Sequence, residues 1–230
     1  MIDKRIASMR EAIAGIKSGD AVMIGGFGSS GIPFELIEAL RLHGADNLTV
    51  ISNNAGSHEI GIATLLRDRL VSKVVCSYPR SQGSIWFERM FEEGAIELEL
   101  MPQGTFAERM RAAGAGLGGF FTPTGYGTKL ADGKETREID GVGYVLEYPL
   151  KAEFALIKAH KGDKWGNLAY NTAGRNFNPV MAMAAETTVA KCWYLSFAPS
   201  LPSSSPPITI CSFTVTVAAY ILRPQLQKVW

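Results

Sequence analysis

The sequence predicts an α/β fold in which helices alternate with the strands of an open, mostly parallel sheet. Four short apolar runs recur at regular spacing and read as strands: AVMIGG (21–26), LTVIS (48–52), KVVCS (73–77) and IELELM (96–101). Between them lie stretches of helical character that end near glycine or a basic residue: PFELIEALRLHG, IGIATLLRDRL and SIWFERMFEEG. This alternation implies crossover connections on a parallel sheet, where ligands collect beyond the carboxyl ends of the strands.

The composition is that of a globular protein. The 230 residues suit one large or two small domains, with 47% hydrophobic and 20% charged residues. A net charge of +1 gives no basic excess for nucleic acid or an anionic membrane, so neither is expected as a partner. Cys76, Cys192 and Cys211 are far apart without a CxxC pair, and the histidines lack metal-binding spacing. We therefore expect no metal site and a reducing, cytoplasmic location.

The first element is predicted to be an amphipathic helix. Ile6, Met9, Ile13 and Ile16 share one helical face, and Gly19 lies just beyond it. Charges every few residues distinguish this segment from a signal peptide, which needs an uninterrupted apolar core.

The second half of the chain mixes turns, strands and a helix. Residues 119–150 are turn-rich and end in GYVLEYPL, which predicts a long loop followed by a hairpin strand. EFALIKAH (153–160) is predicted to be another strand. NFNPVMAMAAETTV (176–189) predicts a short helix after an Asn-rich loop, with Pro179 in its first turn.

The last forty residues, 191–230, differ from the rest and are predicted to form an atypical tail to a domain spanning residues 1–190. No acidic residue follows Glu186 and no glycine follows Gly174. One interpretation is a Pro/Ser-rich linker followed by an apolar strand at 208–222, which is shorter than the roughly 20 residues that span a bilayer. The other is that a frameshift replaced the segment with which the domain was built.

Glycines follow the first predicted strand in GFGSSG (26–31), which satisfies G-x-G-x-x-G before a helix that starts near Pro33. A dinucleotide site would also need an acidic residue at the end of the second strand, but that strand runs into Asn53 and Asn54. NAD is therefore a minor hypothesis. Such a loop can still aim backbone amides at an anion, although it could equally be a tight turn that binds nothing.

Several blocks of the sequence resemble the alpha, or A-type, subunit of the family I coenzyme A transferases. They occur in the family's order across roughly residues 1–190: DAVMIGGFGSSGIP (20–33), SNNAG (52–56), MPQGTFAERMRAAGAG (101–116), GYGTKLADGKETREIDG (125–141), YVLE (144–147), AEFALIKAHKGDKWGNLAY (152–170) and RNFNPVMAMAA (175–185). The segments KVVCSYPR and GKETREIDG are most similar in sequence to the 3-oxoadipate CoA-transferases of this family, and next to its succinyl-CoA:acetoacetate transferases.

The resemblance implies an enzyme that moves CoA from succinyl-CoA to a 3-oxo acid. The leading candidate for this acceptor is 3-oxoadipate, an intermediate of aromatic catabolism. In the family, the nucleophile that attacks the thioester and then carries CoA is a glutamate of the B-type subunit, and its Ser-Glu-Asn-Gly-like motif does not occur here. The chain alone should therefore be inactive. It would use a CoA thioester as substrate without a permanently bound cofactor, and would form a heterodimer or heterotetramer with the B-type subunit. Acetoacetate as acceptor, or a non-catalytic CoA-binding domain, are the alternatives.

The candidate site residues follow the predicted strand ends. Gln103 comes after the fourth strand, before a helix that Thr105 and Glu108 would start as a capping box, and by resemblance lines the active site. Asn53 and Asn54 would contact substrate, and Arg80 could pair with a distal carboxylate of a dicarboxylic acceptor. By resemblance to the family, one continuous stretch is predicted to contact CoA: Gly25, Gly26, Phe27, Gly28, Ser29, Ser30 and Gly31.

Overall fold

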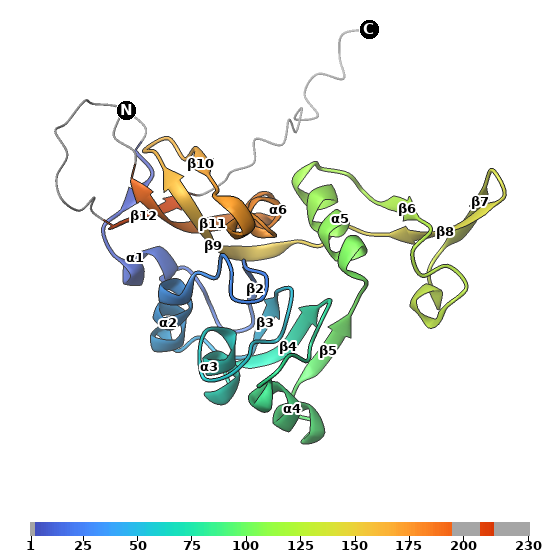
Figure 1. Ribbon diagram of the computed structural model, residues 1–230, viewed down its shortest axis with the longest axis horizontal. Coiled ribbons are helices and arrows are strands. Elements are labelled where there is room, and N and C mark those ends of the chain that lie inside the picture. Colours follow the sequence, from blue (N-terminus) through green and yellow to red (C-terminus); the bar gives the residue numbers. More distant parts are fainter. Residues whose placement is uncertain (1–2, 195–207, 214–230) are drawn as a thin grey trace, which may run out of the picture.

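The computed structural model describes residues 3–194 and 208–213, and its main feature is one long sheet (Figure 1). The strands of this sheet lie in the order β1-β12-β11-β9-β2-β3-β4-β5, and β10 pairs with β9. Their bounds are β1 Arg5–Ile6, β2 Ala21–Ile24, β3 Leu48–Ile51, β4 Val71–Cys76, β5 Glu97–Leu100, β9 Ala152–Gly162, β10 Leu168–Ala169, β11 Ala185–Tyr194 and β12 Ile208–Phe213.

The predicted mostly parallel α/β sheet is confirmed. From β11 through β9, β2, β3 and β4 to β5, every neighbouring pair is parallel, whereas β12, β1 and β10 pair antiparallel. Each of the four strands predicted in the first half of the chain is present within a few residues of its expected bounds. Because the six strands from β11 to β5 share one direction, their carboxyl ends form one continuous edge.

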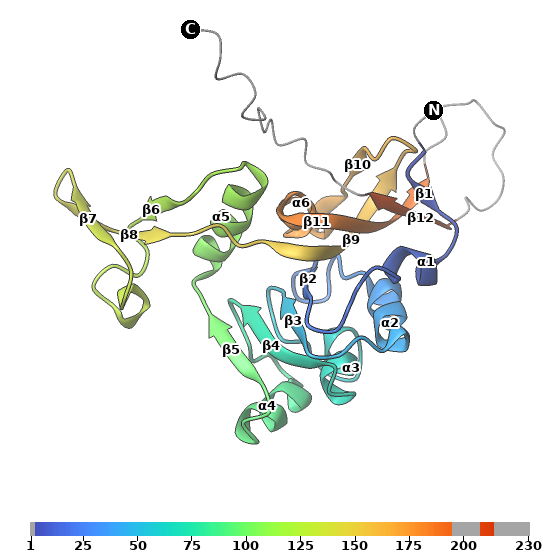
Figure 2. The same cartoon turned by 180° about the vertical axis from the view of Figure 1, so that it is seen from behind.

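Helices cover both faces of the sheet, as the two views show (Figures 1 and 2). On one face, α1 to α4 pack over Val22 and Ile24, while α5 and α6 pack over Met23 on the other. Alternate strand residues thus enter separate cores, which is why the strands read as continuous apolar runs. The helices are α1 Met9–Ile13, α2 Phe34–His43, α3 Ile62–Arg67, α4 Ile85–Glu92, α5 Gln103–Gly114 and α6 Asn178–Ala184.

The predicted N-terminal helix is wrong at its start. Ile6 lies in β1, opposite Ile210 of β12, and α1 begins only after Ser8. The Ser8 side chain accepts a hydrogen bond from the amide of Glu11 at 3.2 Å, as an N-cap does. The expected apolar face survives in part, since Ile13 and Ile16 are both buried, although Ile16 lies in the turn beyond the helix.

The helix predicted over residues 176–189 is also too long. It ends at Ala184, and the Thr-Thr-Val sequence that follows lies in β11, where β-branched residues fit a pleated sheet. The domain boundary predicted at residue 190 falls within this strand, which pairs with β9 up to Tyr194. Of the predicted tail strand, Ile208–Phe213 is β12, while the predicted Pro/Ser-rich linker, from residue 195, and residues 214–230 lie outside the described residues.

Residues 119–150 form a second, three-stranded sheet that stands away from the main one (Figure 2). The expected hairpin is present as β7 Thr136–Ile139 and β8 Val142–Glu147, with β6 Phe120–Thr122 on the other side of β8. Short 3-10 helices lie at Lys129–Ala131 and Thr172–Gly174. The nearly buried Glu147 carboxylate accepts a hydrogen bond from Lys134 Nζ at 2.6 Å and lies 3.9 Å from Arg109 of α5. These ion pairs tie the small sheet to the helix that begins at Gln103.

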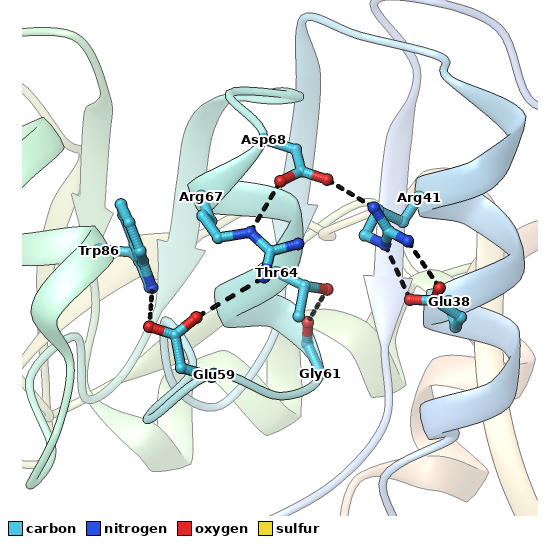
Figure 3. Close-up of polar contacts among 8 residues, drawn as sticks. All are labelled: Glu38, Arg41, Glu59, Gly61, Thr64, Arg67, Asp68 and Trp86. Atoms are coloured by element: carbon cyan, nitrogen blue, oxygen red, sulfur yellow. Dashed lines mark hydrogen bonds and ion pairs between the residues drawn. The ribbon is translucent and has the colours of Figure 1, made fainter.

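A chain of ion pairs, completed by one hydrogen bond, joins α2, α3 and α4 (Figure 3). Asp68 binds Arg41 and Arg67, each at 2.8 Å. Arg67 continues to Glu59 at 3.6 Å, and Glu59 accepts a hydrogen bond from Trp86 at 3.1 Å. Asp68 is therefore the link between α2 and the rest of the network.

Replacing Asp68 with asparagine should lower the melting temperature at pH 7 by about 2 °C, because partly exposed ion pairs contribute little. Hydrogen bonds from Arg67 and then Arg41 hold the pKa of Asp68 below its usual range, so folding favours the ionised form. That contribution is present above the unfolded pKa of about 3.9 and is lost as the pH falls through the lower folded pKa. Thermal unfolding from pH 7 to pH 3 should show the wild-type advantage shrinking. A constant difference across that range, or an equal loss in Asp46→Asn, would contradict this account.

Candidate active site

A pocket of about 520 Å³ opens at the carboxyl ends of β2, β3, β4 and β5. The segment that follows each of these strands contributes to its lining, as the parallel arrangement predicts. The lining residues are Phe27, Gly28 and Ser29 after β2, Asn53, Asn54 and Ser57 after β3, Ser77, Tyr78, Ser81 and Gln82 after β4, and Gln103 after β5.

The glycine-rich loop after β2 makes a tight turn with its corner at the pocket. Phe27 and Ser30 exchange two backbone hydrogen bonds of 3.0 Å, and between them Gly28 has a φ of 58°, which glycine adopts without strain. Of the predicted block 25–31, only Phe27, Gly28 and Ser29 line this pocket. The amides of Phe27 and Ser30 are already used within the loop, so the loop offers fewer free donors than its sequence suggests.

A buried asparagine from the other half of the chain lies against both ends of the predicted block, Gly25 and Gly31. Asn178 Nδ2 donates to the carbonyl oxygen of Gly31 at 3.1 Å and of Gly174 at 2.9 Å, while its Oδ1 accepts from the amide of Lys158 at 2.9 Å. A β-carbon on Gly25 would overlap that Oδ1 atom. Gly25 thus makes room for Asn178 rather than for a ligand.

Asn53 and Asn54 both line the pocket, and each is fixed by a hydrogen bond. The hydroxyl of Ser77 donates to Asn53 Oδ1 at 3.1 Å, which leaves the Nδ2 group as the donor on this 5% exposed side chain. Asn54 Oδ1 accepts from the amide of Gly56 at 2.8 Å. Asn54 therefore takes part in a tight turn and also lines the pocket wall.

Gln103 lies in the pocket wall and is the first residue of α5. The capping box predicted for Thr105 and Glu108 is wrong, because Pro102 occupies the N-cap position and Phe106 donates to its carbonyl at 2.8 Å. Thr105 is instead a buried residue of the first turn, and its hydroxyl has no hydrogen-bond partner among the described residues. Glu108 pairs with Arg111.

Arg80 does not line the pocket, although its neighbour Ser81 does. Its side chain is 61% exposed, and its Nε lies 3.8 Å from Glu88 of α4. Five polar residues of the lining were not predicted from the sequence: Ser57, Ser77, Tyr78, Ser81 and Gln82. Ser77 and Tyr78 directly follow β4, so their sequence position at a strand end predicts the pocket lining in the same way as that of Asn53.

Every side chain that lines the pocket is uncharged. Its amide and hydroxyl groups can donate hydrogen bonds to a carbonyl or carboxylate oxygen, but none of them is a carboxylate that could attack a thioester. Cys76 does not supply a nucleophile either, because burial in β4 raises the pKa of its thiol to about 11. The pocket thus has the groups to orient an acyl substrate and lacks an evident nucleophile.

The described part of the chain contains no cluster of candidate metal ligands and no helix that could cross a bilayer. No three or more His, Cys, Asp or Glu side chains of residues 3–194 and 208–213 gather as a metal site would require. Among the same residues, no helix has the length and apolar character needed to cross a bilayer.

The sequence model of one family, described as coenzyme A transferase, matches residues 6–196. The chain belongs to this coenzyme A transferase family. It is 60% identical over 191 residues to the A-type subunit of the 3-oxoadipate CoA-transferase of Pseudomonas putida, a match that covers 83% of each protein. It is 50% identical over 189 residues to the A-type subunit of the succinyl-CoA:3-ketoacid coenzyme A transferase of Xanthomonas campestris, covering 82% of this chain and 77% of that protein.

Solved structures of other transferases share the fold. An acyl-CoA transferase from E. coli O157:H7 superposes with a TM-score of 0.72 at 20% identity, covering 90% of this chain and 45% of that one. The glutaconate coenzyme A-transferase of Acidaminococcus fermentans gives a TM-score of 0.70 at 18% identity, covering 84% and 68%. The pocket described above therefore lies at the strand ends of a CoA-transferase fold.

Proposed function

We propose that the chain is the A-type subunit of a CoA-transferase that moves CoA from succinyl-CoA to 3-oxoadipate. The observation that carries this proposal is the pocket at the carboxyl ends of β2 to β5, which is lined by neutral hydrogen-bond donors and by no carboxylate. The similarity to the Pseudomonas putida protein supports the choice of acceptor.

The proposed reaction divides between two chains. The nucleophile is a glutamate of the B-type subunit, which attacks the carbonyl carbon of succinyl-CoA and expels the CoA thiolate, leaving an acyl-glutamyl anhydride. The thiolate then attacks the glutamyl carbonyl, releases succinate and forms a glutamyl thioester; the acceptor acid reverses these steps. Gln103 and Asn53 would hold the acyl oxygens and orient the incoming carboxylate. No permanently bound cofactor takes part in this scheme.

A second acceptor, acetoacetate, is favoured by one observation. A dicarboxylic acid such as 3-oxoadipate needs a cation for its distal carboxylate, and no cation lines the pocket. If 3-oxoadipate is the acceptor, we propose Arg80, the neighbour of the lining residue Ser81, as the partner of its distal carboxylate. In this structure the Arg80 side chain lies beside Glu88 instead. The Xanthomonas campestris relative is named for 3-ketoacids in general.

The test is CoA transfer from succinyl-CoA, measured on this chain alone and after mixing with a B-type subunit of the same family. We expect activity only in the mixture, because the pocket lacks a nucleophile. Comparison of 3-oxoadipate with acetoacetate in the mixture then decides the acceptor. Activity of the chain alone would refute the division of labour, and an inactive but stable mixture would favour a non-catalytic CoA-binding domain.

We also propose a cytoplasmic location and a domain of residues 1–190 followed by an atypical tail. Cys76 is a buried cysteine that forms no disulfide, as suits a reducing compartment. The family match ends at residue 196, soon after the composition changes.

A further inference from the structure

The pocket at the ends of β2 to β5 has no charge with which to bind the phosphate groups of CoA. On the proposed function, its substrate carries a pyrophosphate and a ribose 3′-phosphate at one end and the reacting thioester at the other. Phosphate groups are bound in proteins by charge-assisted hydrogen bonds, yet every side chain that lines this pocket is neutral. The thioester end suits the pocket, and the phosphates need another site.

A second, smaller pocket of about 140 Å³ lies at the same edge of the sheet. Its lining residues are Gly31, Lys158, Ala159, His160, Asn171 and Gly174. Lys158 and His160 come from the last part of β9, beyond Leu156, which pairs with Ile24 at the end of β2. Gly31 belongs to the loop whose corner, from Phe27 to Ser29, lines the first pocket. One loop therefore borders both pockets.

The second pocket carries positive charge that is not neutralised by an ion pair. Within the part of the chain that the structure describes, neither Lys158 nor His160 makes an ion pair. Lys191 of β11 lies opposite Lys158 in the sheet and is already paired with Glu35, an acidic side chain near this edge. Glu35 also attracts Lys158 electrostatically, without forming an ion pair with it. Lys158 and His160 are thus available to an anion.

We propose that the pocket at the end of β9 binds a phosphate group of CoA, with Lys158 and His160 as donors. The glycine-rich loop then lies between the two ends of the substrate. Its corner borders the thioester site, and Gly31 borders the phosphate site. This proposal rests on the proposed function only for the identity of the ligand.

The kinetic test uses the mixture with the B-type subunit to compare succinyl-CoA with succinyl-pantetheine, which has no phosphate. Lys158→Gln should raise the KM for succinyl-CoA about tenfold and leave kcat unchanged, because one charge-assisted hydrogen bond is lost. The KM for succinyl-pantetheine should not change. Lys161→Gln is the matched control, since Lys161 is an exposed residue of the same strand that does not line the pocket. An unchanged KM for succinyl-CoA in Lys158→Gln, or equal increases with both substrates, would overturn the proposal.

A binding test separates this proposal from the proposed function. Titration of the full chain with CoA, adenosine 3′,5′-bisphosphate and pantetheine should show that Lys158→Gln and His160→Gln weaken the first two ligands only. If this pattern appears while no transfer activity is found, the proposed function fails and the phosphate site stands. If inorganic phosphate binding is lost in the variants while CoA affinity is unchanged, the pocket is a site for free anions and the assignment to CoA is wrong.

Discussion

Gly25→Ala is expected to destabilise the protein by about 3 kcal/mol or more, although alanine is otherwise a tolerated residue. The new β-carbon would overlap Asn178 Oδ1 and lie 2.8 Å from its Cγ. Asn178 is fully buried and cannot move aside without breaking its hydrogen bonds to the backbone of Lys158 and Gly31. The conflict therefore displaces the glycine-rich loop or the asparagine, and either change lowers the free energy of unfolding.

The second single variant, Asn178→Ala, should also lower the free energy of unfolding by about 3 kcal/mol. It leaves the amide of Lys158 and the carbonyls of Gly31 and Gly174 without their hydrogen-bond partner, at roughly 1 kcal/mol each. When Asn178→Ala is combined with Gly25→Ala, the Oδ1 atom is absent and the new β-carbon no longer overlaps it. The double variant should therefore be little less stable than Asn178→Ala alone, which gives a large coupling free energy.

Urea unfolding of the four proteins measures this cycle. Gly118→Ala is the control, because a β-carbon there meets nothing within 4 Å and its φ is not positive. We expect this control to be nearly as stable as the wild type. Additive losses for Gly25→Ala and Asn178→Ala would show that Gly25 is required for another reason, such as contact with a ligand.

This coupling also marks what the sequence could not predict about the loop. G-x-G-x-x-G suggested that the glycines let a ligand approach, yet Gly25 and Gly31 face an asparagine that lies 147 residues beyond Gly31 in the chain. The sequence predicted a short helix after an Asn-rich loop, but nothing in the local pattern indicates that the side chain of Asn178, the first residue of α6, reaches the glycine-rich loop. A close approach between distant segments has no periodicity and is seen only in the fold.

Strands and site edge were predictable because both follow from local rules. Apolar runs separated by helical stretches give parallel strands, and the residues that follow these strands lie at one edge of the sheet. Asn53, Asn54 and Gln103 were chosen on this ground, and all three line the same pocket. Arg80 was selected by its charge instead, and it lies outside the pocket lining. Helix ends were less predictable: Thr105 and Glu108 satisfy the capping-box pattern, but Pro102 starts the helix earlier in the chain.

Gln103→Ala is expected to lower kcat of the mixed enzyme about a hundredfold or more, with a smaller effect on KM. A preorganised donor that acts mainly in the transition state contributes about 3 kcal/mol to the barrier. The free energy of unfolding should change little, because Gln103 is an exposed residue in the first turn of α5. Gln82→Ala is the matched control, since it removes the same amide from a loop of the same pocket. Equal losses in the two variants would mean that Gln103 has no special role.

Gln103→Glu separates a donor role from simple pocket filling, because it keeps the size of the side chain but replaces the amide donor with a negatively charged acceptor. At pH 8 the new carboxylate would repel both the acyl oxygens and the nucleophilic glutamate of the partner, so this variant should be less active than Gln103→Ala. Protonation restores a neutral hydrogen-bond donor, and an exposed glutamate has a pKa of about 4.3. The ratio of its kcat to that of the wild type should therefore rise as the pH falls from 8 towards 5. A ratio independent of pH would show that Gln103 fills space in the pocket without donating to the reacting groups.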